Sequence, residues 1–382
     1  MMVRFRNVLQ KMQPLWFGVG ARYVIYFYIR STLMMMFILL MIAITIDLAT
    51  HLPSIRARAE ETGTAYPVYL APYLLYRATD IVTHLWGIAC FFGVFLAEIF
   101  RSRRLEKPLF SLAGVSPFNA LAPVLVFGLL AGVAQMSLEN WARPAAVFAQ
   151  VDLGFGAYGR RFKAGLKDSP SWFLRETEAL RARVSIGENP ELWAIELFQG
   201  IDQERLTSII LAERAVPTDT PEVWQFINVV KWDAIPGQKD YAPSAIDRLD
   251  IDIGLIATQV RYHGIQGFYL PWPALREIAQ MKDAPTIDGA NVAIWRRWTA
   301  IFLPGAFALL AASLAHIGCP GREQRIVPLV AFALIGYLMI VSVKVFWSLG
   351  EKGFLSAPAT VFIAMGTAVV ISLLLQIRSS FR

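Results

Sequence analysis

Long apolar stretches and one long polar segment alternate along this chain of 382 residues. The six apolar stretches cover residues 26–49, 69–100, 118–138, 299–317, 326–346 and 357–377. Each has about the 20 residues that a helix rising about 1.5 Å per residue needs to cross ~30 Å of hydrocarbon. The pattern predicts an α-helical membrane protein with six transmembrane helices, divided into two membrane halves at residues 1–144 and 291–382.

The polar segment between the halves, residues 145–290, has the alternation of strands rather than the period of helices. Short runs rich in aromatic and β-branched residues recur between Gly, Pro and Asn breakers. These runs cover residues 172–174, 182–186, 192–198, 206–213, 223–232 and 251–262. Residues 176–183 also permit a helix. We expect an inserted all-β domain, a sandwich or jelly roll.

Basic residues cluster at both chain ends and at every second connection between the apolar stretches. The clusters are Arg4, Arg6, Lys11, Arg22 and Arg30; Arg101, Arg103, Arg104 and Lys107; Arg322 and Arg325; Arg378 and Arg382. Because basic flanks stay in the cytoplasm, both termini are expected there and the β domain on the opposite side. The first stretch is too long for a signal-peptide core, so we interpret it as a retained span.

The net charge of +7 follows this topology and is not a nucleic-acid footprint. Residues 145–290 contain 15 Lys and Arg against 20 Asp and Glu, a net charge of −5, so the remainder has +12. The sequence has no P-loop, nucleophile-elbow, zinc-protease or dinucleotide pattern. Cys90 and Cys319 form neither a disulfide framework nor a metal motif. The chain is therefore expected to lack catalytic residues, cofactors and metals, and to bind no nucleic acid.

The connection between the second and third stretches has the most specific motif in the chain. Glu106 is followed by Gly114 eight residues later, and Leu138–Ala145 follows the third stretch with Glu139, Asn140 and Pro144. In these residues the chain resembles the lipopolysaccharide export permeases, the paired LptF and LptG (YjgP/YjgQ) subunits. Three departures are Pro108 inside the expected coupling helix, Arg103-Arg104 in place of the usual small residue, and an Asn-Glu order that is not kept. Asp47, near the outer end of the first stretch, favours the LptG type.

The resemblance implies a permease subunit of an ATP-driven exporter that extracts lipopolysaccharide from the bacterial inner membrane and passes it to a periplasmic β-jelly-roll bridge. It implies an LptF-like sister permease, a cytoplasmic LptB-like ATPase dimer that hydrolyses ATP, and LptC-like and LptA-like jelly-roll partners. Two alternatives stay open. In the first, the chain is a divergent paralogue that exports another amphipathic lipid instead of lipopolysaccharide. In the second, it is a membrane-anchored receptor that transports nothing.

Residues 102–112 are expected to form a short amphipathic coupling helix with an apolar face and an exposed charged rim. The residues assigned to ATPase coupling are Arg103, Arg104, Glu106, Leu109, Phe110 and Gly114. The apolar face would enter a groove of the ATPase while Glu106 meets basic or hydroxyl groups. The simpler alternative is a solvated basic loop that only sets the topology.

Ionisable residues at membrane depth form a second group of candidates, because a charge at the bilayer centre costs at least ~2.5 kcal/mol. They are Asp47, Arg77, Asp80, His84, Glu98 and Lys344. Arg77 is expected to pair with Asp80, and Glu98 to lie beside Arg101. We assign Arg56, Arg58 and Lys344 to the anionic headgroup of the lipid, with generic interfacial contact as the alternative.

Within the β domain, Ile195, Ile209 and Phe226 are assigned to a path for acyl chains through the roll. An open sheet edge would let a neighbouring β protein extend the sheet by strand addition. The alternative is that these three side chains belong to an ordinary packed core.

Overall fold

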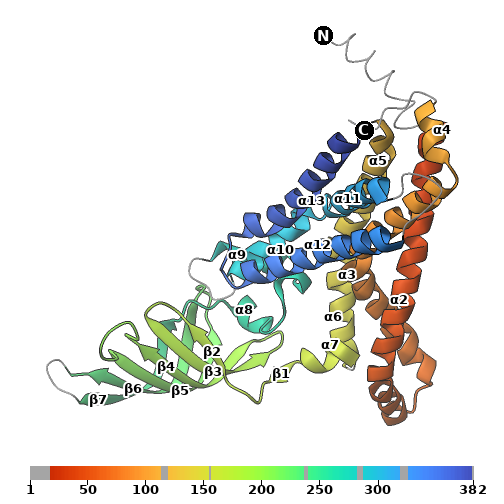
Figure 1. The fold of residues 1–382 in the computed structure, drawn as a ribbon. Helices are drawn as coiled ribbons and strands as arrows, with labels where there is room; N and C mark the ends of the chain where they lie inside the picture. The colour runs from red at the N-terminus through yellow and green to blue at the C-terminus, as the bar shows by residue number, and fades with distance from the viewer. Residues whose placement is uncertain are drawn as a thin grey trace, which may run out of the picture. The chain divides into compact units, whose positions relative to one another are not determined.

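The protein is described by a computed structural model that covers residues 18–112, 119–154, 156–235, 240–281, 287–318 and 326–380. The chain forms two compact units (Figure 1). We call them the membrane unit, Met1–Gln150 with Ile294–Arg382, and the β unit, Val151–Ala293.

Five helical segments of the described residues are long and apolar enough to cross a membrane: α2 (Val19–Thr62), α3 (Tyr66–Arg103), Ala122–Leu153, α12 (Ile326–Glu351) and α13 (Ala357–Ser380). The third comprises α5 (Ala122–Ser137), a π-helical turn η2 (Leu138–Ala142) and α6 (Arg143–Leu153). A sixth span results if the bent pair α10 (Ile287–Thr299) and α11 (Leu303–Gly318) crosses together. The predicted class, an α-helical membrane protein, is confirmed, with five spans or, counting the bent pair, six.

The bend of 61° between α10 and α11 has a local cause in the sequence. Pro304 is the second residue of α11. Proline lacks the N–H that would continue a helix, and its ring clashes with the carbonyl four residues earlier, here that of Ala300. The fourth apolar stretch therefore belongs to a bent pair of helices, with the bend inside the membrane unit.

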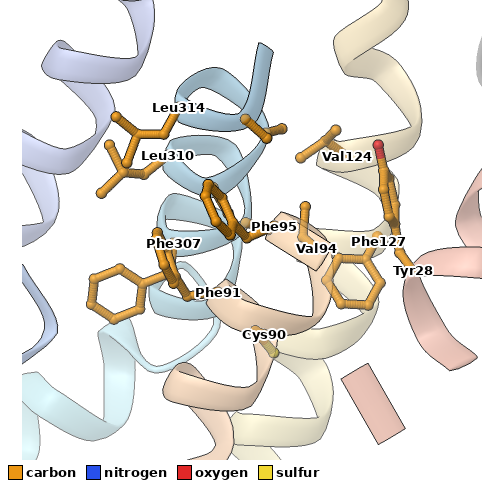
Figure 2. Packing of buried hydrophobic residues seen from close by; sticks show 14 of the residues in the cluster. Tyr28, Cys90, Phe91, Val94, Phe95, Val124, Phe127, Phe307, Leu310 and Leu314 are labelled. Carbon is orange, nitrogen blue, oxygen red and sulfur yellow. The ribbon is translucent and has the colours of Figure 1, made fainter. Parts of the chain in front are cut away.

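The core of the membrane unit lies where α3 and α11 meet their neighbours. Figure 2 shows Phe91 and Phe95 of α3 against Phe307 of α11, with Tyr28 beside Phe127. Close crossings depend on glycine: a Cβ on Gly128 of α5 would lie 2.6 Å from the Cα of Gly305 in α11. Small residues at such crossings let helices pack closely in a bilayer, where dispersion rather than water exclusion favours association.

The β unit is one antiparallel sheet with short helices beside it in the sequence. Its elements are α7 (Gly156–Arg161), β1 (Gly165–Leu166), β2 (Ser171–Leu174), β3 (Glu178–Ile186), β4 (Glu191–Gln199), β5 (Ser208–Pro217), β6 (Val223–Ala234), β7 (Tyr241–Asp252), α8 (Ala257–Arg261) and α9 (Trp272–Gln280). The strand order is β1-β3-β4-β5-β6-β7, with β2 also on β3. An inserted all-β region is confirmed.

Two expectations within the insert are wrong. Residues 251–262 are not one strand, because β7 ends at Asp252 and Ala257–Arg261 forms α8. The helical alternative for residues 176–183 fails because most of that stretch belongs to β3. The strand β7 was missed because it lies at the sheet edge, exposed along most of its length, and so lacks a buried face that would produce an apolar alternation.

One face of the sheet forms the core of the β unit. Leu192, Ile195 and Leu197 of β4 lie on it with Phe226 of β6, all nearly inaccessible to solvent. The register shifts in β3 between Arg181 and Arg183, where its partner strand β4 has an extra residue. Such a bulge increases the local twist of a sheet, so the strands coil rather than lie flat.

Candidate functional site

The connection after α3 is a turn of two residues, Arg104 and Leu105. The N–H of Leu105 donates to the carbonyl of Ser102 at 3.1 Å, and Leu105 adopts a left-handed φ of 56°. A left-handed residue is a usual way to end a helix, at a small cost for a side chain other than glycine. The short helix α4 (Glu106–Leu112) begins directly afterwards, so only part of the stretch 102–112 forms a separate helix.

Glu106 does not point freely into solvent as expected, because two side chains hold its carboxylate. The hydroxyl of Tyr23 in α2 donates to Oε1 at 3.0 Å, and Nε of Arg101 donates to Oε2 at 3.2 Å. Only 17% of the Glu106 side chain is exposed. The sequence indicated the residue but not these two contacts, since Tyr23 lies 83 positions earlier.

Arg101 is itself fixed by a buried ion pair. Its Nη1 lies 2.5 Å from Oε1 of Glu98, and the hydroxyl of Tyr28 donates to the same oxygen at 2.5 Å. The predicted proximity of Glu98 and Arg101 is therefore present. We call Tyr23, Tyr28, Glu98, Arg101 and Glu106 the Glu106 cluster; it links the first turns of α2, the end of α3 and the start of α4.

The other coupling candidates lie around this cluster. Leu109 and Leu112 of α4 are 62% and 85% exposed, while the ring of Phe110 lies beneath the Arg101 guanidinium at 5.8 Å. The guanidinium of Arg104 lies 5.9 Å from the centre of the Phe27 ring, and Arg103 is exposed. Gly114 lies outside the described residues. The start of α2, α4 and the end of α13 lie at the same end of the membrane unit (Figure 1).

A second set of charged residues links α2, α3, η2, α6 and α10 deeper in the membrane unit. Arg77 lies 2.7 Å from Asp47 and 2.9 Å from Asp80, which shows the expected Arg77–Asp80 pair and adds a second partner. The hydroxyl of Tyr73 donates to Asp47 at 2.6 Å. Asp47 of α2 is thereby joined to α3 by two residues.

The set continues through Arg143, whose side chain is fully buried. Its Nε donates to Asp80 at 3.0 Å and its Nη1 to Glu139 at 3.0 Å. Glu139 in turn accepts a 2.7 Å hydrogen bond from Arg296 of α10. We call Asp47, Arg77, Asp80, Arg143, Glu139 and Arg296 the ion-pair chain. Its three acids and three arginines balance in charge, as burial in a low-dielectric interior requires.

Lys344 is exposed but lies next to the ion-pair chain. It lines a small cavity of about 40 Å³ together with His84, Gln135, Arg296 and Trp347. The Arg296 guanidinium stacks on the Trp347 ring at 4.0 Å. The lysine therefore lies beside polar and cationic groups in the last third of α12, although much of its surface is exposed.

The other two headgroup candidates are in a different place. Arg56 and Arg58 lie in the last turns of α2, exposed, and pair with Glu60 at 3.1 Å and Glu61 at 3.3 Å. These glutamates neutralise much of the positive charge that an anionic headgroup would meet. The structure thus does not bring Arg56, Arg58 and Lys344 into one site.

The three β-domain candidates lie on opposite faces of the sheet. Ile195 and Phe226 belong to the buried face. Ile209 is only partly buried and pairs with Phe198 and Trp232, one position out of phase with the buried Ile210. Since facing residues of antiparallel strands point to the same side, Ile209 is outside the core that contains the other two.

Residues 22–378 match the sequence model of a family described as lipopolysaccharide export system permease LptF/LptG. The match includes both membrane halves, the Glu106 cluster, the ion-pair chain and the β unit. The chain belongs to the LptF/LptG family. No match was found among curated proteins. The family confirms the resemblance seen in the motifs, and the protein is a transmembrane lipopolysaccharide export permease of the inner membrane.

Several residues of this permease were not identified as functional from the sequence. Glu139 and Arg143 were noted only as parts of a motif, and Arg296 and Arg297 were not singled out. The available signal was their place at the ends of apolar stretches, where charged side chains are rare and usually paired. Nothing in one sequence indicates which arginine meets which carboxylate, because the partners lie up to 157 positions apart.

Proposed function

We propose that this permease is one membrane subunit of an ATP-driven exporter that extracts lipopolysaccharide from the inner membrane and transfers it to a periplasmic β-jelly-roll bridge. The family match supports the substrate and the permease role. The observation that supports coupling is α4, where exposed Leu109 and Leu112 accompany an oriented carboxylate on Glu106. ATP hydrolysis would take place on a separate cytoplasmic LptB-like dimer.

Coupling in this proposal depends on a groove of the ATPase that receives α4. Leu109 and Leu112 would fill an apolar part of the groove, as amphipathic helices do in helix-in-groove complexes. Glu106 retains acceptor positions beyond the two that Tyr23 and Arg101 occupy, since a carboxylate has about four lone-pair sites. Arg103, Arg104 and Gly114 would complete the contact.

The lipid path is proposed to start in the membrane unit. A sister LptF-like permease would complete an apolar cavity together with this chain, whose Asp47 favours the LptG type. Lys344, with Arg296 beside it, would meet a phosphate of the lipid, while Arg56 and Arg58 would make weaker contacts because glutamates pair with them. Substituting Lys344→Gln should lower lipid binding, with exposed Lys352→Gln as the matched control.

Transfer of the lipid from the membrane unit to the jelly-roll bridge is proposed to use the β unit on the periplasmic side. The edge strand β7 pairs with β6 alone among the described strands, so its outer N–H and C=O groups are available to an LptC-like or LptA-like partner strand. Photocrosslinkers at Ile195 and Phe226 should capture lipid if acyl chains pass through the roll. A crosslinker at Ile209, on the other face, then serves as a comparison. Capture at Ile209 alone would contradict an internal path.

The test of the exporter as a whole is reconstitution with the ATPase and identification of the bound lipid. We expect lipopolysaccharide in the mass spectrum of the purified complex and ATP-dependent release of it from proteoliposomes.

Glu106→Gln should weaken ATPase association at least about tenfold, since charge-assisted hydrogen bonds are lost. Glu60→Gln, an exposed glutamate of α2, is the control. Another bound amphipath would indicate a divergent paralogue, and a lack of ATPase association would leave a membrane-anchored receptor.

A further inference from the structure

We infer that Tyr23 and Arg101 are positioning residues that fasten α4 to α2 and to α3, respectively, so that a displacement of α4 is transmitted to the α2–α3 pair. This inference rests on the proposed function, in which α4 receives force from an ATPase. It assigns a role to one residue of the first span and one of the second.

The two hydrogen bonds to the Glu106 carboxylate come from different helices. Tyr23 reaches it from the second turn of α2, and Arg101 from the last turn of α3. Arg101 is more than nine-tenths buried and cannot follow Glu106 freely, because Glu98 and Tyr28 fix its guanidinium. A shift of Glu106 therefore either breaks these hydrogen bonds or moves both helices.

Packing below the hydrogen bonds adds an apolar contact between α4 and α2. A Cβ built on Gly20, in the first turn of α2, would lie 3.2 Å from the ring of Phe110. The Phe110 ring is thus seated against the α2 backbone on one side and beneath Arg101 on the other. Polar and apolar contacts together make the start of α2 and α4 one packed body.

The displacement can travel further because α2 and α3 are joined along their length. Gly93 of α3 lies against the backbone of Thr32 so closely that a Cβ would not fit. Toward the other end of α2, Asp47 is bound by Tyr73 and Arg77 of α3. A helix of 44 residues extends about 66 Å at about 1.5 Å per residue, so a small tilt at α4 becomes a larger shift at the far end.

The ion-pair chain then connects this pair of helices to the remainder of the membrane unit. Asp80 of α3 binds Arg143, and Glu139 binds Arg296, which stacks on Trp347 of α12. Motion of α3 would therefore reach the cavity that Lys344 lines. Packed interfaces of this kind switch between discrete arrangements rather than deform continuously.

The deciding substitution is Tyr23→Phe, which removes one hydroxyl and leaves the Glu106 carboxylate and the ring in place. Tyr26→Phe is the matched control, three residues further along the same helix with a side chain that is 66% exposed. In proteoliposomes with the ATPase, we expect Tyr23→Phe to retain ATPase association while lipid released per ATP falls roughly tenfold, the effect of losing one hydrogen bond to a charged group. Tyr26→Phe should match the unsubstituted protein.

A second measurement needs no partner and therefore separates this inference from the exporter proposal. Spin labels at Leu112 of α4 and Leu33 of α2, in a background of Cys90→Ala and Cys319→Ala, report the distance between the two helices. We expect a narrow distribution that broadens in Tyr23→Phe and in Arg101→Lys, which keeps the charge but loses the Nε donor. An unchanged distribution, or equal coupling in Tyr23→Phe and Tyr26→Phe, would overturn the inference. Failure of the unsubstituted protein to bind the ATPase would instead overturn the proposed function.

Discussion

At position 143 an arginine side chain lies fully buried between two carboxylates, those of Asp80 and Glu139. A buried ion pair gains little over an apolar pair of the same shape, but removing one partner leaves a charge without compensation. Asp80 would still have Arg77 and Glu139 would still have Arg296, so the loss of Arg143 leaves the ion-pair chain with one uncompensated negative charge, and the stability that depends on Arg143 is mostly the cost of that charge. An exposed pair such as Arg56–Glu60 has no such cost, because water solvates both ions.

Arg143→Met should consequently destabilise the permease by about 3–5 kcal/mol, the range for breaking a buried ion pair. The thermal midpoint in detergent, followed by tryptophan fluorescence, measures the loss. Arg56→Met, which removes an exposed arginine of the same type of pair, should leave the midpoint nearly unchanged. Equal midpoints for both variants would show that the ion-pair chain is not tightly buried.

His263 should make the stability of the β unit depend on pH. Its Nε2 and the Ser171 hydroxyl are hydrogen-bonded at 2.9 Å, and burial lowers the pKa of His263 below its ordinary value of 6.5, with Lys167 adding to the shift. The unfolded chain therefore binds the proton more readily, so stability is full above pH 6.5 and falls as the pH drops through 6.5 toward the lower folded pKa.

The measurement is the unfolding midpoint of the purified permease between about pH 7.5 and pH 5, a range that brackets an unperturbed histidine. His263→Gln should flatten this part of the profile. Ser171→Ala retains the titrating ring, so its profile should keep the slope at lower overall stability. A slope that survives in His263→Gln would assign the pH dependence to another group.

At the scale of elements, glycine sets the distance between α5 and α11. Gly128 and Gly305 face one another, and the neighbouring Gly132 lies against the carbonyl of Ile301 at the break before α11. Close approach here also lets Trp86 of α3 donate to the carbonyl of Ala131 at 2.9 Å. The bent pair α10–α11 is therefore packed on α5 through backbone atoms.

Gly128→Ala should separate these helices and destabilise the protein by about 1–3 kcal/mol, as overpacking of a close interface does. Gly366→Ala in α13 is the control, because a Cβ at Gly366 meets nothing within 4 Å. We expect a lower thermal midpoint for the first variant and an equal or slightly higher one for the second, since alanine is the better helix former. The reverse order would contradict the crossing.

At the scale of the whole molecule, the basic clusters predict one orientation in the membrane. Reporter fusions at Gly200 of the β unit and at Arg382 should report opposite compartments, periplasm and cytoplasm, because four clusters of Lys and Arg fall on one side of a six-span chain. A fusion at Leu112 should agree with Arg382. The same compartment for Gly200 and Arg382 would require an even number of crossings between them, whereas the six-span chain has three.

The sequence also indicated part of the candidate site, through residues with a specific spacing. Glu106 was identified by its distance from Gly114, and the pairing of Arg77 with Asp80 by a separation of one helical turn. Local spacing suffices for such contacts because the helix fixes them. Local spacing gave no sign that Tyr23 lies beside Glu106. The sequence analysis also grouped Ile209 with Ile195 and Phe226, although the strand register puts Ile209 on the other face of the sheet.

By itself the sequence determined the membrane class, the presence of a β insert between the two membrane halves and the family, because each depends on apolar runs or motifs continuous along the chain. Only the tertiary structure decided which buried charges meet, how α10 and α11 bend against their neighbours and which helices hold α4. These contacts join residues far apart in the chain. Their partners are selected by packing and charge neutralisation in three dimensions, which a pattern along one chain does not encode.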